Sequence, residues 1–61
     1  SQANDAERQD LSSRGLSSVP LEILEFVTLR RLILSNNNLS GLPTSIRSLV
    51  NLEYLDLSRN P

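Results

Sequence analysis

The sequence predicts an α/β solenoid, in which short parallel strands line a concave face and short helical segments line a convex face. Three observations predict this fold. The 61-residue chain matches itself after a shift of 23 residues. The second and third units contain leucines in alternation with other side chains, as in a half-buried strand. In two units a proline then precedes a short segment with apolar residues at helical spacing.

The self-match divides the chain into three units. Aligned positions carry the same or a similar side chain, as in Leu11/Leu34/Leu57, Leu16/Leu39, Pro20/Pro43, Ile23/Ile46, Leu29/Leu52, Leu32/Leu55 and Asn37/Asn60. We expect residues 1-28 to form an N-terminal cap and a degenerate first repeat. Residues 29-51 form the complete repeat, and residues 52-61 form a truncated repeat without a C-terminal cap.

The first unit departs from the repeat at its start. Ala6 and Gln9 stand where leucine is expected, and Arg14-Gly15 replaces the Asn37-Asn38 pair of the second unit. A terminal repeat needs a polar outer face, so the polar stretch Ser1–Asp10 is interpreted as a cap. The alternative is that Ser1–Asp5 is disordered. In the helical segment, Leu24 is out of register with the second unit and is predicted to seal this end of the core.

The second unit predicts each element in turn. Leu32 and Leu34 alternate with Ile33, so the two leucines face inward from a strand and Ile33 faces outward. Asn37 suits the following turn, because its amide can satisfy free backbone groups. Pro43 then begins a helical segment over residues 44–50. Its inward face is predicted to carry three apolar side chains, Ile46, Leu49 and Val50.

The third unit supplies Leu52, Leu55, Leu57 and Asn60, followed by Pro61. No helical segment follows the strand, so the last strand is expected to expose an open edge and half a core. The expectation is that the chain is a fragment or is completed by something else. Self-association through the open C-terminal edge is the alternative.

The complete unit, residues 29–51, reads L-R-R-L-I-L-S-N-N-N-L-S-G-L-P-T-S-I-R-S-L-V-N. It therefore resembles the leucine-rich repeat family, and the 23-residue L-P-x-x-I form is similar to intracellular Ras-suppressor and Scribble-type proteins. The resemblance implies a short leucine-rich repeat arc, an asparagine ladder inside it, and non-catalytic protein–protein interaction. It also implies scaffolding of signalling or polarity complexes, often with small GTPases.

The amino-acid composition excludes several classes of function. Six basic and seven acidic residues give a net charge of −1, which argues against nucleic-acid binding. The chain has no cysteine and no histidine, so thiol catalysis and the commonest general base and metal ligand are excluded. We expect no enzyme activity, no cofactor and no metal. No apolar run is long enough for membrane insertion, and the lack of cysteine favours a cytoplasmic location.

Outward-facing side chains form columns across the predicted strands. One column is Arg8, Arg31 and Tyr54, the next is Asp10, Ile33 and Asp56, the third is Ser12, Ser35 and Ser58, and a fourth near the turn includes Arg59. Because tyrosine and arginine are enriched at binding hot spots, a protein partner is predicted to contact this face. The central residues are Arg31, Ile33, Tyr54 and Asp56, with Arg8, Asp10 and Arg59 at the periphery. The serines are attributed to lateral packing.

Other interpretations stay open. The charged face can simply keep the exposed strands soluble. The chain can be the partner-recruiting part of a larger enzyme, such as a deadenylase or ubiquitin ligase, or a piece of an extracellular receptor. It can also be a building block that self-assembles through its open end. Asn38-Leu39-Ser40 is a glycosylation sequon, and we expect it to be unused.

Overall fold

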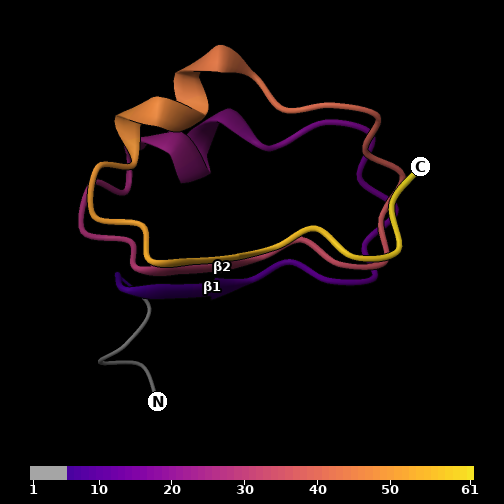
Figure 1. Ribbon diagram of the computed structural model, residues 1–61, viewed down its shortest axis with the longest axis horizontal. Coiled ribbons are helices and arrows are strands. Elements are labelled where there is room, and N and C mark those ends of the chain that lie inside the picture. The colour runs from indigo at the N-terminus through magenta and orange to yellow at the C-terminus, as the bar shows by residue number, and fades with distance from the viewer. Residues whose placement is uncertain (1–5) are drawn as a thin grey trace.

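The computed structural model describes residues 6–61, which form an open, three-stranded parallel sheet and two 3-10 helices (Figure 1). The chain order is β1 (Arg8–Asp10), η2 (Leu21–Glu25), β2 (Arg31–Ile33), η3 (Thr44–Ser48) and β3 (Tyr54–Asp56). The helices run along the side opposite the strands. The expectations for Ser1–Asp5 lie outside the described residues. In the part that is described, neither helix is long and apolar enough to cross a bilayer.

Strand pairing follows the 23-residue shift. The order is β1-β2-β3, and Leu32 pairs with Gln9 on one side and with Leu55 on the other. The ladder continues beyond the strands, because Leu11 N donates to Ile33 O and Leu34 N donates to Asp56 O, both at 2.8 Å. The pairing register that the repeat predicts is therefore confirmed.

The core lies between the sheet and the helices, and the second unit dominates it. Leu29, Leu32 and Leu34 are fully buried. Around them pack further buried side chains from the first unit and from the segments before and after η3, namely Val19, Ile23, Leu24, Leu39 and Leu49. Leu24 is 7% exposed, so its place in the core is confirmed although the second unit carries Arg47 at that position.

The predicted helical face is wrong at one residue. Leu49 is buried and Ile46 is half-buried against the core, but Val50 is 77% exposed. The segment is a 3-10 helix that ends at Ser48, and Leu49 N closes it on Ile46 O at 3.1 Å. The chain then turns, so the α-helical spacing that would direct Val50 inward no longer applies.

Two asparagines join neighbouring units. Asn37 Nδ2 donates to the carbonyl oxygens of Leu11, Leu34 and Ser35, and its Oδ1 accepts from the N–H groups of Arg14 and Leu16. Asn60 repeats this pattern one unit later, where its Oδ1 accepts from Leu39 N at 2.9 Å. Arg14 holds the equivalent position in the first unit, and its guanidinium instead donates to Asp10 O at 3.3 Å.

The turn after each strand passes through the left-handed region at one repeated position. Ser13, Asn36 and Arg59 have φ angles of 56°, 57° and 59°. Only Asn36 is of a residue type that commonly tolerates this conformation. In the first and third units the residue at this position does not favour the left-handed conformation. The geometry of the turn therefore follows from the repeat architecture.

Candidate partner-binding surface

The outward side of the sheet, here called the strand face, consists of Arg8, Asp10, Arg31, Ile33, Tyr54 and Asp56. Each strand has three residues, and the middle one points toward the core. The first residues of the strands form one row, and the last residues form a second row about 6.6 Å away along the strands. The structure thus brings six of the seven predicted binding residues together.

The first row carries positive charge and an aromatic ring. Arg8 pairs with Arg31, which pairs with Tyr54, so neighbours lie about 4.8 Å apart. Both arginines are exposed, and Tyr54 is 51% exposed. Among the described residues neither guanidinium has an ion pair or a hydrogen bond. Two like charges thus stand on neighbouring strands, where they repel each other, and Arg8 also interacts electrostatically with Asp10 in the second row.

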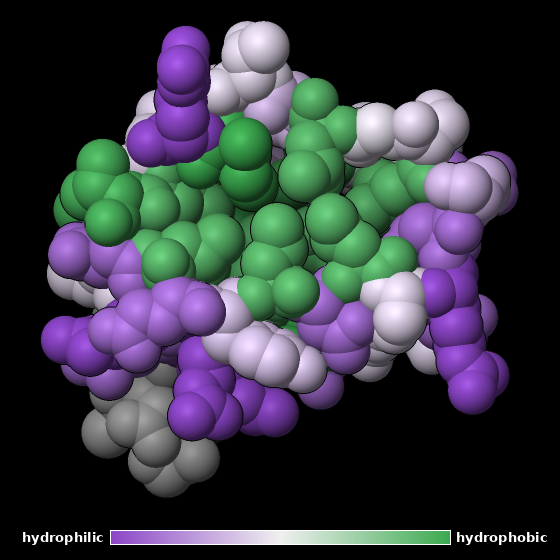
Figure 2. Space-filling model, in the orientation of Figure 1, coloured by the Kyte–Doolittle hydropathy of each residue, from purple (hydrophilic) through white to green (hydrophobic). Residues whose placement is uncertain are grey.

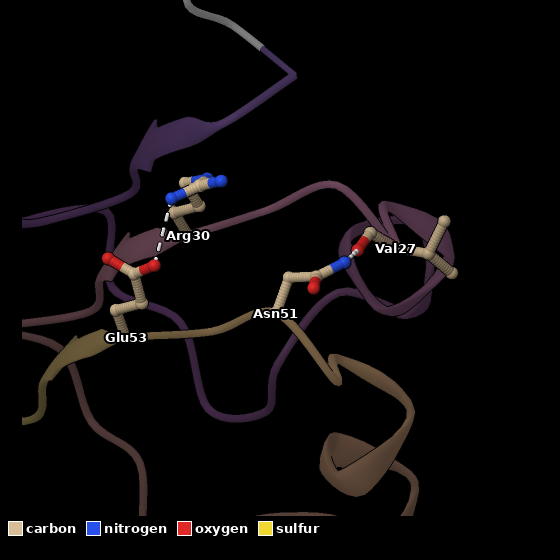
Figure 3. Close-up of polar contacts among 4 residues, drawn as sticks. All are labelled: Val27, Arg30, Asn51 and Glu53. Atoms are coloured by element: carbon tan, nitrogen blue, oxygen red, sulfur yellow. Dashed lines mark hydrogen bonds and ion pairs between the residues drawn. The ribbon is translucent and has the colours of Figure 1, made fainter.

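Unlike Arg8 and Arg31, the neighbouring Arg30 has an ionic partner. Arg30 Nη1 forms an ion pair with Glu53 Oε2 at 2.9 Å, while Asn51 Nδ2 donates to Val27 O at 2.8 Å (Figure 3). Neither Arg30 nor Glu53 is among the binding residues that the sequence predicts. They line an open polar hollow of about 400 Å³ together with Glu7, Arg8 and Arg31. The signal that could have identified the ion pair is the 23-residue spacing between its two opposite charges.

The second row carries two carboxylates on either side of Ile33. Asp10 Oδ1 accepts hydrogen bonds from Ser12 N at 3.0 Å and from Ser12 Oγ at 2.7 Å. Asp56 Oδ1 accepts the same two bonds from Ser58. The Ser12 hydroxyl and then its N–H lower the pKa of Asp10, and the Ser58 N–H and then its hydroxyl lower the pKa of Asp56. Both groups are therefore negative at neutral pH.

Arg59 lies at the end of this surface, in the turn after β3. It is exposed, and it occupies the repeat position of Ser13 and Asn36. At that position in the other units, Asn36 Nδ2 donates to Ser13 Oγ at 2.8 Å. The structure thus places Arg59 beside the strand face and not within it.

The chemistry of the strand face suits binding. The lowered pKa of each aspartate leaves no proton to donate at neutral pH, so neither carboxyl is suited to general acid catalysis. Within residues 6–61, no three acidic side chains gather in a group that could hold a metal ion. What remains is an exposed patch with both signs of charge, an aromatic ring and an aliphatic side chain.

Comparison with protein-family models gives a match. The family model described as Leucine Rich repeats (2 copies) matches residues 27–61, more than half of the chain. The matched range contains β2, η3 and β3, and it includes all four residues predicted to be central to binding. No curated protein matches the chain.

Proposed function

The chain belongs to the leucine-rich repeat family, whose repeats are generally protein-interaction modules, and from that premise we propose that its strand face binds a protein partner without catalysis. We also propose that the repeats follow a short solenoid arc with this face on the concave side. Support for the arc comes from the parallel sheet and from the two helices on the opposite side. Residues 1-28, 29-51 and 52-61 would be the successive units of that arc.

The observation that carries the proposal is the pairing of Arg31 with Tyr54. Both side chains are exposed on neighbouring strands, and Arg31 has no ionic partner among the described residues. Arginine and tyrosine contribute disproportionately to binding energy at protein interfaces. Ile33 and Asp56 complete the centre of the proposed contact. Arg8, Asp10 and Arg59 form its periphery, where charges steer association more than they add affinity.

We also propose a repeat subtype, a cellular role and a location for the chain. The L-P-x-x-I segment of the second unit, in which Pro43 precedes η3, supports the Ras-suppressor and Scribble-like subtype and a role in a signalling scaffold. The absence of cysteine from the sequence supports a cytoplasmic location.

The sequon offers a test of location. Asn38 is exposed and follows the left-handed turn, so its side chain would be accessible to glycosylation. The natural protein that contains this chain is expressed in its own cells, and its gel mobility is compared with that of the Asn38→Gln variant. Equal mobility is expected. A slower, glycosidase-sensitive band for the unaltered chain alone would contradict the cytoplasmic assignment.

The binding proposal is tested with the double variant Arg31→Glu/Tyr54→Ala. Proteins captured from a cell extract by the immobilised chain are quantified for each variant. Loss of two hot-spot side chains is expected to reduce capture about tenfold or more. The matched control is Arg47→Glu, which makes the same charge reversal on η3, on the opposite side of the molecule.

Both variants change exposed positions and are expected to keep the far-UV circular dichroism spectrum of the unaltered chain. The control is expected to capture the same proteins as that chain. If the double variant also captures them in unchanged amounts, the strand face is not the binding site.

A further inference from the structure

The two rows of the strand face carry opposite charges. The first row contains Arg8 and Arg31, and the second row contains Asp10 and Asp56. Figure 2 shows mostly hydrophilic side chains along its lower edge, where Figure 1 places the strands, and apolar side chains across the middle of the same view. A partner that lies on the strand face therefore meets positive charge at one end of the strands and negative charge at the other.

The charges on and beside β1 are balanced within the molecule. Arg8 and Arg14 act electrostatically on Asp10 and favour its charged form. Arg30, which precedes β2, is balanced by Glu53 at 2.9 Å, as Figure 3 shows. These charges already have counter-charges, so a partner gains less by pairing with them.

Arg31 and Asp56 lack such counter-charges. Within residues 6–61, the Arg31 guanidinium has neither a hydrogen bond nor an ion pair. The Ser58 N–H and hydroxyl lower the pKa of Asp56, the like charge of Asp10 acts against them, and no arginine of the described chain contributes. Arg31 and Asp56 are diagonal neighbours on β2 and β3, with Cα atoms about 8 Å apart. A partner can therefore supply an anion to one and a cation to the other.

An apolar contact area lies between these two charges. Ile33 is half-buried beside Asp56, and Tyr54 is 51% exposed beside Arg31. Ile33 has a described strand on each side, so its surroundings within the sheet are complete. A partner side chain between the two charges meets an aliphatic group and an aromatic ring, which suits an apolar residue.

The backbone of β2 is already hydrogen-bonded on both sides. Arg31 N donates to Glu7 O at 2.9 Å toward β1, and Asp56 O accepts from Leu34 N at 2.8 Å toward β3. A segment on the strand face therefore contacts side chains only, and its own N–H and C=O groups need partners within the segment. An α-helix meets this need, because its backbone hydrogen bonds are internal.

We propose that the partner places a helix on the strand face, with an acidic and a basic residue four positions apart and an apolar residue on the same helix face. The inference rests on the proposed binding function and specifies the chemistry of the partner. Four helical residues rise about 6.0 Å, close to the distance of about 6.6 Å between the two rows. The acidic side chain then meets Arg31, and the basic side chain meets Asp56. The apolar residue packs on Ile33 and Tyr54.

The test selects binders from a displayed library of one helical-bundle scaffold, randomised on one exposed helix face. A library of flexible peptides of the same length is selected in parallel. The immobilised chain is the target, and recovered sequences are counted. Acidic and basic residues four positions apart are expected to be enriched about tenfold or more over the starting helical library. Either order of the two charges is compatible, because the helix can run in either direction along the strands.

Charge-removing variants of the target identify which residue selects which charge. Arg31→Gln is expected to abolish the enrichment of the acidic residue, and Asp56→Asn that of the basic residue. Asparagine retains an oxygen that can accept the Ser58 hydrogen bonds. Arg47→Gln, on η3 at the opposite side of the molecule, is the matched control and is expected to select the same pairs as the unaltered chain. Circular dichroism checks that each target is folded.

The geometry is tested on one recovered helix. Moving its acidic and basic residues to positions two apart keeps the composition but sets the charges on opposite helix faces. Affinity for the unaltered chain is expected to fall about tenfold or more. Equal affinity of the two helices would overturn the proposed spacing.

Three further results would overturn the inference. They are recovered helices without the charged pair, the same pairs selected by Arg31→Gln and Asp56→Asn as by the unaltered chain, and recovery of flexible peptides alone. In each case the binding function stands if Arg31→Glu/Tyr54→Ala still loses capture of proteins from an extract. If that double variant captures them in unchanged amounts, the proposed function itself fails.

Discussion

Asn37 shows how one side chain can hold two repeats together. Its amide makes five hydrogen bonds to backbone groups, and four of the five partners precede the Ser35–Asn38 turn in which it lies. The side chain is half-buried, so water cannot replace all of these bonds. A turn residue therefore acts as a structural connector between the first and second units.

Replacement of Asn37 by alanine is expected to destabilise the chain by about 2–4 kcal/mol, because it leaves several partly buried N–H and C=O groups unpaired. The measurement is the urea midpoint at fixed protein concentration. Asn38→Ala is the matched control, since Asn38 is exposed and its side chain has no hydrogen bond among the described residues. Equal midpoints for the two variants would show that the connector role is wrong.

The aspartate and serine pairs give a prediction about pH. The folded-state pKa of Asp10 lies below its ordinary value of 3.8, first because of the Ser12 hydroxyl. Its contribution to stability is complete above the unfolded-state pKa. That contribution is lost as the pH falls through the lower folded-state value. We expect stability to decline below about pH 4 for this reason.

Ser12→Ala removes the hydroxyl and is expected to raise the pKa of Asp10 toward its ordinary value. Titration of the side-chain carboxyl carbons by NMR measures both aspartates in one sample. Asp56 is the internal control, because its Ser58 partner is unchanged. An unchanged Asp10 pKa in the variant would contradict the assigned cause.

Sequence reasoning succeeds at residues where a side chain has one dominant role. Asn37 in the turn and Leu24 in the core were predicted and are confirmed. Lateral packing was the interpretation of Ser12 and Ser58, but each bonds the aspartate two positions earlier. That role depends on a turn conformation that serine and aspartate only permit and do not require.

At the scale of elements, the repeat period carries more information than the side chains. The 23-residue shift predicted the register of all three strands, although β1 has the polar sequence Arg-Gln-Asp. Nothing in that triplet by itself predicts a strand. The type of helix was harder to predict from the sequence, because five-residue segments are too short for α and 3-10 spacing to differ clearly. Val50 was misplaced for this reason.

Leu34 tests the role of the second strand in the core. It is fully buried directly after β2, so Leu34→Asp places an unpaired charge among leucines and is expected to abolish folding. A thermal melt followed by far-UV circular dichroism measures this. Leu21→Asp introduces the same side chain at an exposed site and is expected to melt as the unaltered chain does. A cooperative melt of Leu34→Asp would contradict the repeat alignment.

At the scale of the whole molecule, the motif of the second unit was sufficient to identify the family. The same motif could not identify a partner, because inward leucines define the fold whereas outward residues vary freely with it. Arg31 and Tyr54 occupy outward positions, so the sequence indicates where a partner would bind and not which partner binds. Which partner binds depends on the charge and shape of the exposed face.

The repeated connections between units also bear on how the chain folds. Hydrogen bonds from Asn37 and Asn60 to the preceding unit span 21–26 residues, as does the ion pair between Arg30 and Glu53 at 23 residues. Each added unit therefore closes a loop of nearly the same length, and the entropy lost in closure is nearly constant from one unit to the next. Folding can then proceed like a zipper, in which the speed is set by one repeat length and not by the length of the chain.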